Sequence, residues 1–204
     1  MKLYFAPGAC SLSPHIVLRE LGLPFDLIKV NLGEHKTQDG EDFKSINPKG
    51  YVPALKTDDG KVLTEGVAIN QYLADKKPEK KLAPANGTFE RYELQEWLNF
   101  ISTEVHKTYS PMFNSALPDA ARAIFMDKLK KRFGEINTVL EKHDFLTGSN
   151  FTIADAYLYT LLRWAPKFQI DLKQWPALAK FHDRVDQRPA VKAAVEAEAA
   201  SKTA

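Results

Sequence analysis

The stretch that decides the fold runs from Asn47 to Ala68 and reads NPKGYVPALKTDDGKVLTEGVA. It begins with turn chemistry, Asn47-Pro48-Lys49-Gly50, because proline fixes φ and glycine tolerates positive φ. The apolar run Val52-Pro53-Ala54-Leu55 then predicts a short strand with proline at its start, where no ladder N–H is required. Asp58-Asp59-Gly60 turns the chain back into Lys61-Val62-Leu63-Thr64, so we expect two strands paired as a hairpin.

The same stretch carries two features with chemical meaning. The Val52-Pro53 bond can be cis at modest cost, and a cis bond there would turn the Val52 N–H and C=O outward, as an open edge for an extended peptide ligand. The first N–H groups of a helix that begins at Gly66 would accept a carboxylate, and Glu65 beside them could hold an ammonium. Together these groups describe a socket for a small zwitterionic peptide. The pattern also fits an ordinary hairpin that leads into a helix.

Length and composition exclude several classes of protein. The 204 residues are 44% apolar and 26% charged, which is ordinary for a globular protein of one large or two small domains. A net charge of +2 gives no broad field for nucleic acid or an acidic membrane. No apolar run is long enough to predict a membrane span, and the chain begins with a strand pattern rather than a signal peptide. A single cysteine argues against internal disulfides, so we expect a cytoplasmic protein.

The first half alternates strands and helices. Lys2 to Ala6 and Phe25 to Val30 have the residues of strands, and the apolar stripe between His15 and Leu21 predicts a helix. One helical turn is expected near Asp42 to Ile46, before the hairpin. An amphipathic helix then follows from Gly66 to Lys76, for which Thr64 is the expected N-cap. The predicted order is βαβαββα, a mixed sheet with helices on it.

The second half has a helical period throughout. The run KPEKKLAPANG at 77–87 is the best linker candidate, because it is rich in proline, lysine and small residues. We therefore predict a first domain at 1–77, a linker at 78–87 and an all-helical domain at 88–204, which makes the fold class α+β. The predicted helices of the second domain cover 88–114, 119–142, 152–164, 175–187 and 190–199. The third of them has Thr152 as its N-cap and Asp155 at N3, an aspartate form of the capping box.

Cys10 stands between the first strand and the first helix. The orphan N–H groups and the dipole of a helix start favour a thiolate. The spacing Cys10-Ser11-Leu12-Ser13 resembles a redox Cys-x-x-Cys motif whose second thiol has become a hydroxyl. Because the chain has no resolving cysteine, any disulfide at Cys10 must be with another molecule. The alternative interpretation is a small buried hydrophobic residue without chemistry.

A polar line follows the first helix of the second half. Asn99, Thr103, His106 and Ser110 are spaced by four, three and four residues, which places them on one face of an α-helix. Such a line is usually solvated surface, and it becomes a site only if the first domain packs over it. His106 could then transfer a proton or donate a hydrogen bond. The histidines show no metal-ligand spacing and there is no glycine-rich phosphate loop, so we expect neither a metal nor a nucleotide.

Five stretches in order resemble the bacterial beta-class glutathione transferases, and the likeness covers essentially the whole chain. They are PGACSLSPH at 7–15, NPKGYVPAL at 47–55, LTEGVAINQYLAD at 63–75, EWLNFISTEVHK at 96–107 and FTIADAYLYTLLRWAP at 151–166. The resemblance implies a thioredoxin-like domain, a helical domain, a homodimer and glutathione bound between the two domains.

The resemblance also implies roles for single residues. Cys10 would face the glutathione sulfur, and Val52 beside cis-Pro53 would pair with the peptide's main chain. The γ-glutamyl end would lie on Glu65 and Gly66. The glycyl carboxylate would lie near His35, which stands where the family often has lysine, or near Lys36. The helical domain, of this or the partner subunit, would contribute Asn99, Thr103 and His106.

The implied activity is that of an enzyme. Glutathione would be its co-substrate, with no other cofactor, and the acceptor would be a small hydrophobic electrophile. Cys10 and His106 are the expected catalytic residues. Cys10 adds a second expectation, glutathione-dependent thiol–disulfide exchange through a mixed disulfide. The alternative is a non-catalytic stress protein that binds glutathione or a hydrophobic ligand on the same fold.

Overall fold

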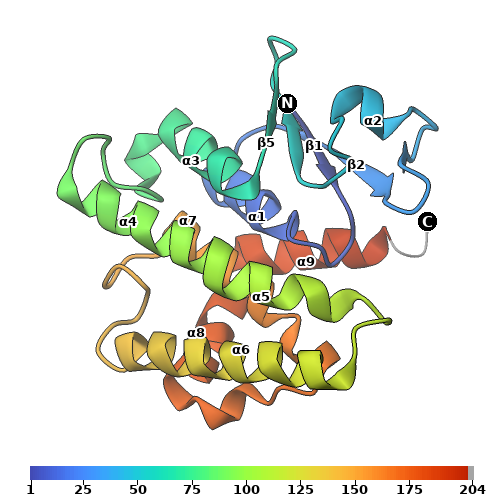
Figure 1. Cartoon of the computed structure of the whole chain (residues 1–204). Coiled ribbons are helices and arrows are strands. Elements are labelled where there is room, and N and C mark those ends of the chain that lie inside the picture. Colours follow the sequence, from blue (N-terminus) through green and yellow to red (C-terminus); the bar gives the residue numbers. More distant parts are fainter. Residues whose placement is uncertain (202–204) are drawn as a thin grey trace. The chain divides into compact units, whose positions relative to one another are not determined.

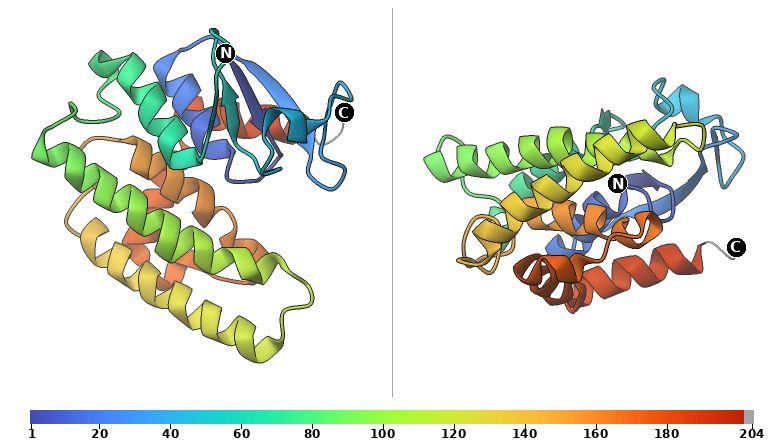
Figure 2. Two further views of the ribbon diagram at one scale, coloured as in Figure 1. Left: turned by 45° about the horizontal axis from the view of Figure 1, so that its top comes forward. Right: turned by 60° about the horizontal axis from the view of Figure 1, so that its bottom comes forward.

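The computed structural model describes residues 1–201, and the chain divides into two compact units (Figures 1 and 2). The first comprises Met1–Lys81 and the segment from Asp186 onward, and the second is Leu82–Val185. The predicted domain boundaries remain a prediction. The contacts group the chain differently in one respect, because the last helix belongs to the first unit, where it packs against the first helix. Residues 202–204 of the predicted helical domain lie outside the described residues.

The first unit is a mixed sheet with helices, as the pattern predicts, and the sheet has five strands where four were expected. Its strands are β1 (Lys2–Phe5), β2 (Asp26–Asn31), β3 (Lys36–Thr37), β4 (Ala54–Lys56) and β5 (Val62–Thr64), in the spatial order β3-β2-β1-β4-β5. Its helices are α1 (Leu12–Leu21), α2 (Phe43–Ile46), α3 (Gly66–Lys76) and α9 (Pro189–Ala200), with a 3₁₀ turn at Pro78–Lys80. Strand β1 runs parallel to β2 and antiparallel to β4, and β4 pairs antiparallel with β5. Only β3 was missed, because its two polar residues carry no alternation.

Both faces of β1 are covered, which fixes the loop that follows it. Leu3 and Phe5 are buried on one face and Tyr4 on the other, as the two-residue period of a strand requires. Tyr4 belongs to a core cluster with Phe43 of α2 and with Val52. Helix α1 contacts α3 and α9, and Figure 1 shows these three helices beside the sheet. The loop leaving β1 therefore starts from a rigid point.

The predicted hairpin forms between β4 and β5. Ala54 pairs with Thr64 and Lys56 with Val62, and Gly60 makes the turn with a φ of +83°. The Val52-Pro53 bond is cis. Helix α3 begins at Gly66 as predicted, but its N-cap is Glu65 and not Thr64. The reason is that β5 continues through Thr64, so the whole change of direction falls on one residue, Glu65, which takes a φ of +68°.

The second unit is entirely helical. Its elements are α4 (Phe89–Phe100), the π-helical segment η2 (Ile101–His106), α5 (Lys107–Tyr109), the 3₁₀ segment η3 (Ser110–Phe113), α6 (Asp119–Leu140), α7 (Ile153–Leu162), the 3₁₀ segments η4 (Ala165–Phe168) and η5 (Leu172–Gln174), and α8 (Pro176–Asp186). All ten residues of α7 are buried, which makes it the centre of this unit. The predicted capping box of Thr152 and Asp155 is present at its start. Within the described residues, no helix is both long and apolar enough to cross a membrane.

The predicted helix at 88–114 is one continuous helical run, but it is not uniform. Thr88 caps it, and its hydroxyl accepts a hydrogen bond from the Arg91 N–H at 3.3 Å. Between Ile101 and His106 the backbone is π-helical. A π turn holds more residues than an α turn, so the helix changes phase across this segment. The α-helical spacing used to place Asn99 and His106 on one face therefore does not hold through this segment, and their shared face stays a prediction.

Candidate active site

Cys10 lies two residues before α1, and its thiol reaches a distant part of the chain. Its Sγ donates a hydrogen bond to the Val52 carbonyl oxygen at 3.4 Å. The Ser11 hydroxyl holds the loop in place, since it accepts from the Ala6 N–H at 3.2 Å and donates to the Ala6 carbonyl at 3.3 Å. The expectation of a fully open Val52 edge is thus half met: the carbonyl contacts the thiol, while the Val52 N–H has no partner within residues 1–201.

His35 packs against the turn that precedes Val52. A Cβ built on Gly50 would lie only 3.0 Å from His35 Cε1, so the imidazole covers this glycine closely. Gly50 also has a φ of +71°, so both the close contact and the backbone conformation favour glycine here. The His35 Nδ1 is buried and has no hydrogen-bond partner in the described chain. Lys36, the other candidate for the glycyl carboxylate, is exposed on β3.

Glu65 and Gly66 border the same segment from the other side. The Glu65 carboxylate pairs with Lys49 Nζ at 3.2 Å, and both side chains are exposed. A Cβ on Gly66 would lie 3.7 Å from Pro53 Cγ, which places the start of α3 beside the cis-proline. Within the described chain, the N–H groups of Gly66 and Val67 have no acceptor, as expected for a first helical turn. The structure therefore gathers five predicted residues around the segment Lys49–Pro53: Cys10, His35, Val52, Glu65 and Gly66.

His106, in the second unit, is held by aromatic neighbours. Its Nδ1 lies 2.6 Å from the Tyr157 hydroxyl, and its ring meets Trp164 edge-on with centroids 5.3 Å apart. The Thr103 hydroxyl donates to the Asn99 carbonyl at 3.0 Å, so it serves its own helix, and both of these side chains are exposed. The sequence analysis missed Tyr157, for which the spacing along a fully buried helix gave no signal.

A buried acid braces the Cys10 loop and was also missed. The Glu198 carboxylate, on α9, accepts hydrogen bonds from the Gly8 N–H at 3.0 Å and from His15 Nδ1 at 3.2 Å. Arg19 Nε donates to His15 Nε2 at 2.9 Å, so the proton on this imidazole is at Nδ1, where it can be donated to Glu198. Gly8 and Glu198 are 190 residues apart. A glutamate in an alanine-rich helix resembles a surface residue, so no local pattern indicated this contact.

An aromatic cluster surrounds one buried hydroxyl in the second unit. The ring of Tyr109 meets those of Trp164 and Phe168, and the ring of Phe113 contacts the same two. Burial raises the pKa of the Tyr109 phenol above its usual range, and its hydroxyl has no partner in the described chain. This hydroxyl is therefore neutral. Within residues 1–201, no group of three or more His, Cys, Asp or Glu side chains is arranged to hold a metal ion.

A thioredoxin-like sheet with a cysteine after its first strand and a cis-proline before β4, together with a helical domain, defines the class of the glutathione transferases. The family model for the N-terminal domain of glutathione S-transferases matches residues 8–76, and the model for the C-terminal domain matches residues 100–189. Glutathione S-transferase GstA of Escherichia coli O157:H7 is 44% identical over 198 residues, which are 97% of this chain and 98% of that protein.

Two solved structures agree with this. A sphingomonad glutathione S-transferase complexed with glutathione has a TM-score of 0.95 at 45% identity, covering 98% of this chain and 99% of that one. A beta-class glutathione S-transferase of Sphingomonas chungbukensis has a TM-score of 0.94 at 44% identity, covering 97% and 98%. The chain belongs to the glutathione S-transferase family, and the predicted beta-class resemblance and α+β fold are confirmed. It is an enzyme, a glutathione transferase.

Proposed function

We propose that the enzyme binds glutathione along the segment Lys49–Pro53 and conjugates its thiol to small hydrophobic electrophiles. The observation that carries this proposal is the unpaired Val52 N–H beside the Cys10 thiol, because it offers an extended peptide a donor next to a sulfur. The cysteinyl carbonyl of glutathione would accept from that N–H, with the peptide extended along the residues that precede β4. The glutathione sulfur would then lie near Cys10 Sγ.

The two charged ends of glutathione would be held on either side of that segment. The γ-glutamyl carboxylate would accept from the N–H groups of Gly66 and Val67, with the helix dipole in its favour. Its ammonium would replace Lys49 as the partner of the Glu65 carboxylate, whose present ion pair is exposed and therefore weak. The glycyl carboxylate would take a hydrogen bond from the imidazole of His35, with Lys36 as the alternative.

Conjugation requires the glutathione thiol to lose its proton and attack. We assign Asn99, Thr103 and His106, of this or the partner subunit, to the helical-domain side of the site. His106 would accept or donate the proton, with its ring fixed by Tyr157. The sulfur then forms a bond to the electrophilic carbon, and a leaving group such as halide departs with the electron pair. The protein's contribution is to position and stabilise the thiolate.

Titration with glutathione tests this binding site directly. In ¹⁵N-edited NMR spectra, saturable shifts should centre on the amides of Val52, Gly66 and Val67, and turnover of an activated aryl chloride should require glutathione. Binding that leaves these amides unmoved would place the peptide elsewhere. Binding at these amides without turnover of any electrophile would leave only a glutathione-binding role.

A second activity is favoured by the Cys10 thiol itself. In a mixed disulfide of glutathione and another thiol, the Cys10 thiolate would attack the glutathionyl sulfur, and the other thiol would leave with a proton. A second glutathione thiolate would then release oxidised glutathione and regenerate Cys10. Cys10 is not part of a disulfide in the described chain, which suits a reducing compartment, and we place the protein in the cytoplasm.

Intact-protein mass after incubation with oxidised glutathione tests this second activity. Cys10 should gain one glutathionyl group, which persists until an external thiol is added because the chain has no second cysteine. The Cys10→Ala variant should lose both the adduct and disulfide reduction, yet keep most of the conjugation activity. No adduct on the folded wild-type protein would rule out the exchange activity.

We also propose a two-fold homodimer. Large apolar side chains are exposed on each unit: Tyr51 is 73% exposed on the first, and Phe89 and Tyr92 on α4 are 74% and 59% exposed on the second. A two-fold interface would bury the same exposed apolar side chains on both copies. Light scattering should give twice the chain mass, and a Phe89→Ser, Tyr92→Ser variant should shift towards monomer. A wild-type monomer at micromolar concentration would contradict the proposal.

A further inference from the structure

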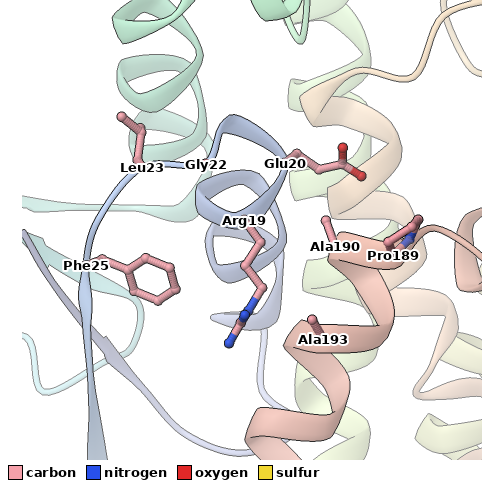
Figure 3. Close-up of a pocket in the computed structure, with 8 residues that line it drawn as sticks. All are labelled: Arg19, Glu20, Gly22, Leu23, Phe25, Pro189, Ala190 and Ala193. Atoms are coloured by element: carbon pink, nitrogen blue, oxygen red, sulfur yellow. The ribbon is translucent and has the colours of Figure 1, made fainter.

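A pocket of about 520 Å³ lies in the first unit between the end of α1, the start of α9 and the residues that lead into β2. Figure 3 shows the Arg19 side chain extending into it between the ring of Phe25 and Ala193. Leu23 and Ala190 complete its apolar walls. None of these residues belongs to the site assigned to glutathione. The volume falls within the range of small-molecule sites.

The guanidinium of Arg19 is held in place through one nitrogen, and its other two nitrogens can donate hydrogen bonds to a ligand. Its Nε donates to His15 Nε2 at 2.9 Å, and its Cζ lies 5.8 Å from the centre of the Phe25 ring. Within residues 1–201, its two Nη nitrogens have no hydrogen-bond or ion-pair partner. A guanidinium fixed through Nε presents the other donors as a planar fork, which matches a carboxylate or sulfonate.

Glu20 is the one acid among the described residues that line the pocket, and it does not compete for this fork. The two Glu20 carboxylate oxygens accept from Arg188 Nε at 2.6 Å and from Arg188 Nη2 at 3.0 Å, so the pair is neutral as a unit. Figure 3 shows Glu20 directed towards Pro189 and Ala190, away from the Arg19 guanidinium. The pocket therefore combines one available cation with walls that are otherwise apolar. The positive end of the α9 dipole beside it adds to the same field.

We propose that this pocket binds a small organic anion with a flat apolar body, such as an aryl carboxylate or sulfonate, at a site separate from the glutathione site. The acid group accepts two hydrogen bonds from the Nη nitrogens of Arg19. The ring packs on Leu23, Phe25 and the two alanines of α9. A neutral aromatic molecule of the same shape lacks the charged hydrogen bonds, and a small inorganic anion lacks the apolar contact.

The test uses naphthalene-2-sulfonate as the probe and naphthalene-2-methanol as its neutral analogue, with ¹⁵N-edited NMR spectra of the full chain. Given the usual binding energy per atom of such ligands, we expect a Kd of about 0.1–1 mM. Saturable shifts should centre on Leu23, Ala190 and Ala193. The alcohol should bind at least about tenfold more weakly, since it loses the charge-assisted hydrogen bonds.

Variants locate the site. Ala193→Glu places a carboxylate in the pocket beside Arg19 and should abolish binding. Ala199→Glu makes the same change of charge at an exposed position of the same helix, outside the pocket, and should leave the Kd unchanged. Arg19→Gln keeps an amide donor for His15 but removes the cation, and should weaken binding about tenfold or more. Equal binding by Ala193→Glu and wild type, shifts centred elsewhere, or an alcohol that binds as tightly as the sulfonate would each overturn the proposal.

Discussion

Among the residues that the structure describes, each unit of the enzyme contains one buried carboxylate that fastens a loop, and the two differ in how far they reach. Asp155, in the second unit, is fully buried and accepts from the Leu146 N–H at 2.9 Å and the Thr152 N–H at 2.7 Å. Glu198, in the first unit, is 4% exposed and accepts from the Gly8 N–H at 3.0 Å. Asp155 acts within ten residues of itself, whereas Glu198 joins the two ends of the chain.

This difference shows that a sequence can predict a buried acid whose partners are close in the chain, but not one whose partners are distant. A capping box lies within four consecutive residues, so Thr152 and Asp155 predict it from the sequence alone. Glu198 meets Gly8 only after the sheet, α1 and α9 have packed. The first carboxylate therefore stabilises a local element, while the second couples the Cys10 loop to the end of the chain. Changes at Asp155 and Glu198 should separate these two roles, and they are given in order of their expected effect on stability.

The largest loss of stability should come from Asp155→Ala. It leaves the N–H groups of Leu146 and Thr152 and the Thr152 hydroxyl without their acceptor in a buried place. We expect the free energy of unfolding to fall by about 3–5 kcal/mol, measured by urea denaturation. The control is Asp171→Ala, an exposed cap of a short 3₁₀ segment, which should cost about 1 kcal/mol or less. Equal costs at the two positions would mean that burial of the cap adds nothing.

The free energy of unfolding should depend on pH because Asp155 titrates at a different pH in the folded and unfolded states. Burial raises the pKa of the Asp155 carboxyl from 3.8 to about 6, although the hydrogen bonds from Leu146 and Thr152 act in the opposite direction. The folded state thus holds this proton more tightly than the unfolded state. The resulting stabilisation is fully present below about pH 4 and is lost as the pH rises through 6, by about 3 kcal/mol in total.

The Asp155→Asn variant isolates this contribution because an amide does not titrate. Between pH 4 and pH 7, wild type should lose about 2–3 kcal/mol of unfolding free energy relative to that variant. Urea denaturation at four or five pH values measures the difference. A difference that stays flat across this range would show that the pKa of Asp155 is not raised in the folded protein.

Glu198→Gln should lower the free energy of unfolding less than Asp155→Ala does, and it should affect residues that are distant in the sequence. One amide oxygen cannot replace both carboxylate oxygens, so either Gly8 or His15 loses its acceptor. We expect a loss of about 1–2 kcal/mol, together with faster hydrogen exchange at the Gly8 amide and faster alkylation of Cys10. Glu196→Gln, exposed on the same helix, is the matched control and should change neither rate. An unchanged Gly8 amide would mean that Glu198 does not fasten the loop.

The same contrast explains how much of the molecule the sequence predicts. The hairpin, the start of α3 at Gly66 and the capping box at Thr152 depend on a few neighbouring residues, and all were predicted correctly. Strand β3 and the contact of Glu198 with Gly8 depend on tertiary packing, and neither was predicted. The π-helical segment at Ile101–His106 is a third such case, because apolar spacing cannot show where a helix changes phase.

The candidate site divides in the same way. Its backbone donors, at Val52 and Gly66, follow from turn chemistry and a helix start. The partners of its side chains do not: Lys49 beside Glu65 and Tyr157 beside His106 come from elements whose approach the sequence leaves open. The assignment of Asn99 and Thr103 rests on the family likeness, and it stays a prediction.

Glu65 is a third carboxylate, and it sharpens the comparison because it is exposed and its backbone is strained. Its only ion pair in the described chain is the surface pair with Lys49, so the loss of the carboxylate alone should cost the fold less than about 1 kcal/mol. Its φ of +68° is unfavourable for any residue with a Cβ and acceptable for glycine. Glu65→Gly should therefore be more stable than Glu65→Ala by about 1 kcal/mol in urea denaturation.

Glutathione affinity, measured by calorimetry, should respond differently from stability. Both variants lose the counter-charge for the γ-glutamyl ammonium, and a charge-assisted hydrogen bond of about 1.5–3 kcal/mol corresponds to a ten- to hundredfold weaker Kd in each. A strained residue that is kept despite its cost to the fold is expected where its side chain serves a ligand. If Glu65→Gly bound glutathione as tightly as wild type, the γ-glutamyl end would have to lie elsewhere. If glycine gave no gain in stability over alanine, the positive φ at this position would carry no cost, and the carboxylate alone would distinguish Glu65 from its neighbours.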